Sequence, residues 1–189
     1  MTGIAVIILC HNQGRTIEES VDSTLSQTRA PAEVVLIDDG STDILTIQKI
    51  ATLRRPGLRI VRIENRGTAG ARNYGARLTS SPYLVFLDGD DVLERIYFER
   101  AGALLDTRPE LGVVACALQA FEGAEYLWVP PPFNFVDGFA KATPPVTSMM
   151  RRTVFDSVGG FDENFGLFED LDFWLSVLER GGAQGRNPC

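Results

Sequence analysis

The sequence contains little histidine or cysteine and has no excess of positive charge. One His and three Cys occur among its 189 residues, and Cys10, Cys116 and Cys189 lie far apart, which argues against a zinc centre and against a disulfide framework. We therefore expect a reducing, cytoplasmic location, with Cys10 and Cys116 buried in strands. Lysine and arginine number 18 against 25 acidic residues, for a net charge of −7. Nucleic-acid binding needs a basic surface, so no nucleic-acid partner is expected.

Long hydrophobic runs are also missing. The longest early apolar run, Ile4–Cys10, is far shorter than the roughly 20 residues that span a bilayer, and no basic segment precedes it as in a secretory signal. We therefore expect no transmembrane segment. With 44% hydrophobic and 23% charged residues the composition is that of a globular protein, and the length fits one domain over residues 1–189.

Short apolar runs alternate with segments of helical period. Strands are expected at Ile4–Cys10, Glu33–Ile37, Arg59–Ile63, Tyr83–Leu87 and Gly112–Leu118. Helices are expected after Thr16 and after Asp43, and at about residues 70–78, 92–105, 152–158 and 170–178. This alternation predicts an α/β fold with a mostly parallel sheet and helices on both faces. Phe121–Pro145, rich in proline and aromatic residues, is interpreted as a long irregular loop.

The helix starts carry capping signals. Thr16 and Glu19 have the capping-box spacing, and the run Ser41-Thr42-Asp43 offers a cap for the following helix. Ligands of parallel α/β sheets bind at the carboxyl ends of strands, so the residues just before these helices are the first place to look for a site.

Three carboxylates follow the fourth expected strand, in Asp88-Gly89-Asp90-Asp91. In an extended segment Asp88 and Asp90 point to the same side, so both can reach one ion, and oxygen ligands suit Mg²⁺ or Mn²⁺. Gly89 would let a ligand approach the backbone. A helix cap explains one of these aspartates but not three, and we therefore favour a metal site.

Two further segments lie after strands. Asp38–Asp43 is an acidic turn, for which turn chemistry and ligand binding are equally good explanations. Asn65–Gly75 contains glycines and arginines but neither GxGxxG nor a P-loop lysine, which leaves a phosphate-binding loop or a plain glycine turn. His11 directly follows the first expected strand, at the same edge of the sheet. Glu169 and Asp170 open the last helix, where the helix dipole stabilises carboxylates by about 0.3–1 kcal/mol.

Taken in order, six segments resemble the family 2 glycosyltransferases. They are Ala-Val-Ile-Ile-Leu-Cys-His-Asn (5–12), Asp-Asp-Gly-Ser-Thr-Asp (38–43), Gly-Ala-Arg-Asn-Tyr-Gly (70–75), Phe-Leu-Asp-Gly-Asp-Asp (86–91), Gly-Gly-Phe-Asp-Glu (159–163) and Glu-Asp-Leu-Asp-Phe-Trp-Leu (169–175). The resemblance implies the Rossmann-like GT-A fold, with a nucleotide-binding half in residues 1–118 and an acceptor half in residues 119–189. Family members continue past the last helix with a segment ending in basic residues, so we expect the acceptor half to be truncated.

The resemblance also implies roles for individual residues. Asp39 and His11 would contact the nucleoside base. Arg72 and Asn73 would help to hold the nucleotide. Asp90 would bind the metal directly, with Asp88 beside it near the metal or the ribose. Asp170 would be the catalytic base that deprotonates the acceptor hydroxyl. The residues implied beside the acceptor are Asp91, Asp162, Glu163, Glu169 and Trp128, the last as a sugar-stacking face.

The function implied is an inverting, metal-dependent transfer of a sugar from a nucleotide-diphosphate donor, with UDP the commonest carrier, to a hydroxyl of a sugar or lipid-linked acceptor. It would serve polysaccharide or glycolipid synthesis at the cytoplasmic face of a membrane, with peripheral membrane association. Two alternatives stay open: a nucleotide-sugar-binding module with little turnover, and a nucleotidyltransferase. The latter would typically carry a glycine-rich, basic signature where this sequence has Cys10-His11-Asn12-Gln13.

Overall fold

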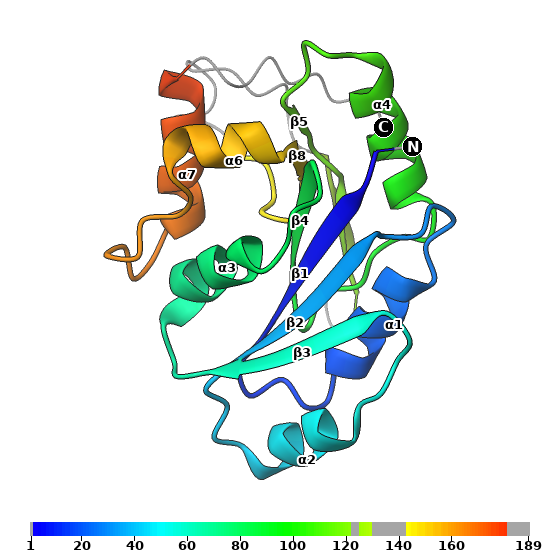
Figure 1. Ribbon diagram of the computed structural model, residues 1–189, viewed down its shortest axis with the longest axis vertical. Coiled ribbons are helices and arrows are strands. Elements are labelled where there is room, and N and C mark those ends of the chain that lie inside the picture. The colour runs from blue at the N-terminus through cyan, green and yellow to red at the C-terminus, as the bar shows by residue number, and fades with distance from the viewer. Residues whose placement is uncertain (1, 122–124, 130–142, 181–189) are drawn as a thin grey trace.

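A computed structural model describes residues 2–121, 125–129 and 143–180 (Figure 1). Its strands are β1 Ile4–Cys10, β2 Glu33–Asp39, β3 Leu58–Ile63, β4 Tyr83–Asp88, β5 Val113–Val114, β6 Leu118–Ala120, β7 Tyr126–Trp128 and β8 Met149–Arg151. Its helices are α1 Ile17–Leu25, α2 Ile44–Thr52, α3 Gly67–Arg77, α4 Tyr97–Thr107, α6 Arg152–Val158 and α7 Glu169–Glu179. The expected alternation of strands and helices is confirmed through α4.

The main sheet has the strand order β3-β2-β1-β4-β8-β5, and a separate two-stranded sheet joins β6 to β7. β1 pairs in parallel with both β2 and β4, and β2 pairs in parallel with β3. The chain thus leaves β1 toward one edge and returns to its other side as β4. This reversal of strand order between β1 and β4 opens a crevice at their carboxyl ends, which is where ligands bind in folds of this class.

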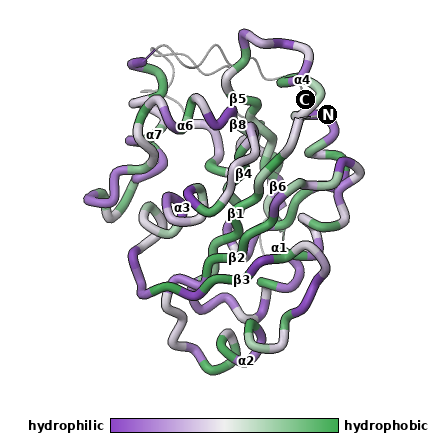
Figure 2. Tube along the Cα trace, in the orientation of Figure 1, coloured by the Kyte–Doolittle hydropathy of each residue, from purple (hydrophilic) through white to green (hydrophobic). Residues whose placement is uncertain are grey.

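Two cores, one on each face of the sheet, explain why β1 is buried along its whole length. Its even-numbered residues from Ile4 to Cys10 join a cluster with α1 and α4, and Ala5, Ile7 and Leu9 join a cluster with α3, α6 and α7. Alternate side chains of a strand point to opposite faces, so a strand covered on both sides is continuously apolar. Figure 2 shows these hydrophobic strands at the centre of the molecule, and the prediction of helices on both faces is confirmed.

The edge of the sheet formed by β8 and β5 differs from the prediction. β8 lies antiparallel between β4 and β5, with Leu84 opposite Met150 and Val113 opposite Met150 on its other side. A strand of three residues carries no readable period, and for this reason it was missed. It also comes from the half assigned to the acceptor, so the two expected halves share one sheet. The single expected strand Gly112–Leu118 is divided into β5 and β6, and Cys116 lies half-buried between them rather than in a strand.

Two further expectations change. The helix expected from Val92 begins at Tyr97, because the preceding backbone is bonded to the segment around α1: Thr28 N–H donates to the Arg95 carbonyl at 3.0 Å, and the Gln27 side chain donates to the Glu94 carbonyl at 2.9 Å. The irregular segment expected at residues 121–145 includes the strand β7, while residues 122–124 and 130–142 lie outside the described residues. Within the described parts of the chain, no helix combines the length and apolarity needed to cross a membrane.

Candidate functional site

The acidic run at the end of β4 forms a tight turn. Asp88 is the last residue of the strand, and the Asp91 N–H donates to the Asp88 carbonyl at 3.0 Å. The chain therefore turns at Gly89 and Asp90 and does not stay extended. The expectation that Asp88 and Asp90 point to the same side because they alternate along a strand is wrong. Asp90 and Asp91 are exposed, and the Asp88 side chain is 35% exposed.

Contacts with β1 and α1 fix this turn. A Cβ added at Gly89 would lie 2.6 Å from the Leu9 carbonyl oxygen and 2.7 Å from Oε1 of Gln13, so the position requires glycine for packing against the protein itself and not for approach of a ligand. Thr16 Oγ1 donates to the Gly89 carbonyl at 2.8 Å, and Ser20 Oγ donates to the Asp91 carbonyl at 2.6 Å. Thr16 makes no side-chain cap on α1, so the predicted capping box is wrong and its hydroxyl anchors the acidic turn instead.

Charge is crowded in this turn. Partial desolvation and then the neighbouring charges of Asp88 and Asp90 raise the pKa of Asp91 to about 6. Asp91 is an exposed residue, so solvent screens part of this repulsion. A cation bound here would relieve the same repulsion.

A buried arginine joins the turn to the last helix. Arg72 on α3 donates from Nη2 to Oδ1 of Asp88 at 3.1 Å and from Nη1 to Oε1 of Glu169 at 2.8 Å. Thr68 Oγ1 donates to the same Glu169 oxygen at 2.7 Å. Although burial opposes the shift, the hydrogen bond from Thr68, a backbone N–H and the charge of Arg72 together hold the pKa of Glu169 below its ordinary value. The ends of β4 and α7, which lie far apart in sequence, therefore meet across α3.

Asp170 lies at the start of α7, directly after Glu169. It is half-buried, and its Oδ1 accepts the N–H of Leu171 at 2.8 Å. The residue before the pair, Phe168, has a left-handed backbone with φ of 68° although it is not glycine. Because Asp88 and Glu169 share Arg72, the end of β4, with the candidate metal ligands, is linked to the start of α7, with the candidate base.

Asn73 is held differently from its neighbour. It is 7% exposed, its Nδ2 donates to the Phe161 carbonyl at 2.8 Å and to Oε1 of Glu163 at 3.0 Å, and its Oδ1 accepts the Phe161 N–H at 2.9 Å. These contacts fasten α3 to the segment that precedes α7. Asn73 and Glu163 therefore support the site by joining these two segments, while the nucleotide contact of Asn73 and the place of Glu163 beside the acceptor stay predictions. Asp162 is exposed and accepts the N–H of Asn164 at 2.9 Å.

The residues expected to contact a base lie at the carboxyl ends of β1 and β2. Asp39 is 5% exposed and its Oδ1 accepts the Arg66 N–H at 2.7 Å. His11 is exposed, and its Nδ1 lies 2.8 Å from the Asp39 carbonyl oxygen, a contact that requires the proton on Nδ1. The adjoining Asp38 is fully buried and paired with Arg62 at 2.9 Å, so it is structural.

The remaining predicted residue, Trp128, lies in the separate sheet opposite Leu118 and is half-buried. A cavity of about 600 Å³ separates that sheet from the acidic turn. Its lining includes Glu19, Asp91, Val92, Tyr97, Leu118, Phe121 and Leu127. Asp91 thus faces the β6–β7 hairpin, whereas Asp88 faces α3.

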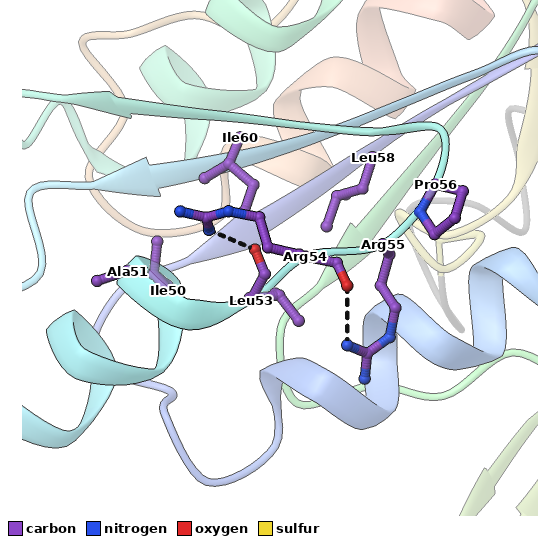
Figure 3. A pocket seen from close by; sticks show the side chains of 8 residues that line it. All are labelled: Ile50, Ala51, Leu53, Arg54, Arg55, Pro56, Leu58 and Ile60. Atoms are coloured by element: carbon purple, nitrogen blue, oxygen red, sulfur yellow. Dashed lines mark hydrogen bonds between the residues drawn. The ribbon is translucent and has the colours of Figure 1, made fainter.

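Another hollow, of about 700 Å³, lies between the end of α2 and β3 (Figure 3). It is lined by Ile50, Ala51, Leu53, Arg54, Arg55, Pro56, Leu58 and Ile60. Its two arginines donate to neighbouring carbonyls, Arg54 to Leu53 and Arg55 to Arg54. It contains none of the predicted site residues and no carboxylate, so the carboxyl edge of the sheet remains the candidate site.

The fit of a metal ion can be judged from the carboxylates present. Among residues 2–121, 125–129 and 143–180, no group of three or more His, Cys, Asp or Glu side chains could hold an ion by itself. Asp88 and Asp90 offer two carboxylates, one of them shared with Arg72. Mg²⁺ and Mn²⁺ characteristically use one or two carboxylates and complete their coordination with water and substrate phosphates. These residues therefore fit an ion that arrives with a phosphorylated substrate.

Sequence reasoning missed the residues that hold this site together. Thr16 and Ser20 anchor the acidic turn, and Thr68 supports Glu169. One signal was available: Thr68 and Arg72 are four residues apart, so they share a face of α3 that would meet the same partner.

Known proteins are similar to this chain in sequence and in fold. The succinoglycan biosynthesis protein ExoU of Rhizobium meliloti (strain 1021) is 42% identical over 203 residues, which cover 95% of this chain and 58% of the relative. The structure of S. aureus TarS 1–349 in complex with UDP matches with a TM-score of 0.76 at 22% identity over 93% of this chain and 55% of that chain. The mannosyltransferase PcManGT of Pyrobaculum calidifontis, in complex with GDP-Man and Mn²⁺, matches with a TM-score of 0.70 at 24% identity over 99% and 55%.

These structural likenesses show the fold, which is that of the GT-A glycosyltransferases, and the chain spans little more than half the length of these relatives. The model of the family Glycosyl transferase family 2 matches residues 5–167, a stretch that contains the carboxyl ends of all four parallel strands and stops just short of Glu169. The protein belongs to glycosyltransferase family 2.

Proposed function

We propose that this protein transfers a sugar from a nucleotide-diphosphate donor, a UDP-sugar in the first instance, to an acceptor hydroxyl, with inversion at the anomeric carbon and with Mg²⁺ or Mn²⁺ as cofactor. The observation that carries the proposal is the joining of the acidic turn to the start of α7. Asp88 and Glu169 are bonded to one guanidinium, and this supports a common site for their chain neighbours Asp90 and Asp170.

On the donor side, the nucleoside would lie at the carboxyl ends of β1 and β2, beside His11 and Asp39. Two unit charges about 4 Å apart at an effective dielectric near 20 repel by about 4 kcal/mol, so a diphosphate beside Asp88 and Asp90 needs a cation. When bound to these two carboxylates, a divalent ion would neutralise the charge that develops on the departing nucleoside diphosphate. Gly89 and the hydroxyls of Thr16 and Ser20 keep the turn in place for this purpose.

On the acceptor side, Asp170 would take the proton of the attacking hydroxyl. It lies in the first turn of α7, at the positive end of the helix dipole, and a carboxylate is one of the side chains that act as general bases. A single base without a partnered nucleophile favours one direct displacement and therefore inversion. In this mechanism the C–O bond to the acceptor forms as the C–O bond to the diphosphate breaks, and the proton passes to Asp170.

The proposal extends to the substrates and to the location of the reaction. ExoU is named for succinoglycan biosynthesis, and TarS and PcManGT are solved with UDP and GDP-Man, which supports a nucleotide-sugar donor and an acceptor in polysaccharide or glycolipid synthesis. We place the reaction at the cytoplasmic face of a membrane, with a sugar or lipid-linked acceptor. Asp91 and the β6–β7 hairpin, with Trp128, would border the acceptor.

Two substitutions separate the donor and acceptor roles. Asp90→Asn should abolish the Mn²⁺-dependent part of UDP binding in calorimetry, whereas Asp156→Asn, an exposed aspartate on α6, should leave it intact. Asp170→Asn should keep UDP binding and lose transfer by about 10²–10⁴-fold, the usual contribution of a general base. Unchanged metal dependence in Asp90→Asn, or unchanged turnover in Asp170→Asn, would contradict the assignments.

The reaction itself is tested with a panel of UDP- and GDP-sugars, with and without acceptor. Release of nucleoside diphosphate that requires an acceptor supports transfer. Binding without release would identify a binding module, and release of pyrophosphate from a nucleoside triphosphate and a sugar phosphate would identify a nucleotidyltransferase. A product with retained anomeric configuration in NMR would exclude the direct displacement.

A further inference from the structure

Arg72 is a buried charged side chain that contacts the carboxylates of the candidate site. Its side chain is 4% exposed, and its guanidinium contacts carboxylates on two different elements, Asp88 at the end of β4 and Glu169 in the first turn of α7. Its Cζ also lies 5.3 Å from the centre of the Phe161 ring. Both terminal nitrogens thus donate to carboxylates of the protein itself.

We infer that Arg72 and Glu169 are positioning residues, which set the place of the base Asp170 relative to the metal-binding end of β4. The inference rests on the proposed function and deepens it. It replaces direct nucleotide binding, the role that family resemblance gives to Arg72, by a structural coupling of the donor side to the acceptor side. Arginine suits this task because its planar fork presents two parallel pairs of donors, whereas lysine is a point charge.

The start of α7 needs such a support. Phe168 precedes the helix with φ of 68°, and in the described residues no side chain caps the helix there. The preceding residues from Asp162 to Phe168 are all exposed. Glu163 in this segment already accepts from Asn73 on α3, and Glu169 adds two further partners on the same helix, Thr68 and Arg72, at the start of α7 itself. Asp170 follows directly, so its position depends on how Glu169 is held.

The arrangement is not the one that stability alone would favour. Arg72 Nε is buried and has no hydrogen-bond partner within the described chain. Burying a charged group with an unsatisfied donor is unfavourable, and ion pairs in interiors add little net stability over apolar packing. The fold thus keeps a locally unfavourable arrangement beside two carboxylates of the proposed site, and such arrangements are expected at functional sites.

Graded substitutions test the coupling. Arg72→Lys keeps the charge but not the fork, Glu169→Gln keeps the acceptor oxygen but not the charge, and Thr68→Ala removes one hydrogen bond to Glu169. The matched controls are Arg77→Lys on the exposed face of α3 and Glu179→Gln at the exposed end of α7. Two readouts are used: steady-state kinetics, and hydrogen exchange of the amides of residues 169–173 in the protein without ligands.

We expect Arg72→Lys and Glu169→Gln each to lower kcat by about 10–100-fold, in line with the cost of a 1 Å misplacement, with the donor KM changed less than about threefold. The amides at the start of α7 should exchange about tenfold faster or more in both variants, and less so in Thr68→Ala. The double variant should be little worse than either single one, because both remove the same link. The controls should match the wild type in both readouts.

Two results would overturn the inference. If Arg72→Lys raises the donor KM or the UDP dissociation constant more than about tenfold at unchanged kcat, then Arg72 is a donor ligand. If hydrogen exchange at residues 169–173 is unchanged in Arg72→Lys and Glu169→Gln, the link does not hold α7. The second measurement needs no turnover. A wild-type protein without transferase activity would therefore refute the proposed function, while the exchange data would still decide whether the link exists.

Discussion

Replacing Gly89 by alanine tests whether the acidic turn is fixed by packing against β1 and α1. The new Cβ would lie 2.6 Å from the Leu9 carbonyl oxygen and 3.0 Å from Cδ1 of Ile17. To reach an ordinary contact the two groups must separate by about 0.8 Å, a shift typical of an overpacked interior. Leu9 lies in the centre of the sheet, paired with Ile37 and Asp88, and cannot yield. The turn must therefore move.

The expected cost follows from this displacement. Overpacking a close contact destabilises proteins by about 1–3 kcal/mol, and Gly89→Ala should lower the free energy of unfolding by that amount. The carboxylates of Asp88 and Asp90 would move with the backbone by a sizeable part of 1 Å. Because such misplacement can cost up to about 10²-fold in rate, Mn²⁺-dependent turnover should fall by about 10–100-fold.

Urea denaturation followed by tryptophan fluorescence measures the first effect, since Trp174 is fully buried in the core. The control is Gly166→Ala, where a Cβ meets nothing within 4 Å; there alanine should leave the protein as stable or stabilise it by about 0.4–1 kcal/mol. If Gly89→Ala is as stable as the wild type and still binds UDP with Mn²⁺, the packing explanation is wrong, and the glycine serves a ligand as the sequence alone had suggested.

Two other predictions concern the anchors of the turn and the dependence of stability on pH. Removing both anchoring hydroxyls in Thr16→Val/Ser20→Ala should lower the unfolding free energy by about 1–3 kcal/mol and weaken Mn²⁺-dependent UDP binding in calorimetry. The control Ser26→Ala loses an exposed hydroxyl, and its unfolding free energy should stay within about 0.5 kcal/mol of the wild type. Equal UDP affinity in the double variant and the wild type would show that the two hydroxyls do not anchor the turn. Hydrogen bonds, chiefly from Ser81, outweigh desolvation and hold the pKa of Glu33 in the folded protein below its ordinary 4.5. The contribution of Glu33 to stability is therefore complete above pH 4.5, and it is lost as the pH falls through the lower pKa of the folded state. Glu33→Gln should therefore destabilise the protein at pH 7 and much less near pH 3, as urea titrations at both values would show; an equal loss at the two pH values would contradict the linkage.

The sequence predicted the parallel part of the fold because local pattern and tertiary structure agree there. The apolar runs of β1 and β4 are continuous over seven and five residues, buried on both faces, and each is followed by turn residues. The short strand β8 gave no such signal. Residues 92–96 have an amphipathic pattern, yet bonds to the segment around α1 prevent them from forming helix, which is a case of tertiary contacts overriding local preference.

The site was predicted in its parts but not in its connections. Asp39, Asp88 and Asp170 could be singled out because acidic residues at strand ends and helix starts are visible in a single sequence. The contact between Arg72 and Glu169 joins residues 97 positions apart, and no local spacing indicates it. The same is true of Asn73, whose partner Phe161 is 88 positions away. Side chains that hold two elements together become visible only when the elements are placed in space.

The late arrival of β8 in the chain has a consequence for biosynthesis. β4 has β1 on one side, but its other side stays open until Met149–Arg151 emerges from the ribosome, more than 60 residues after β4 itself. Until then a buried-type strand has an unpaired edge, which is the kind of surface that recruits other chains. A fragment that ends near residue 118 would keep that edge permanently, and it should aggregate even though it contains every strand of the parallel sheet.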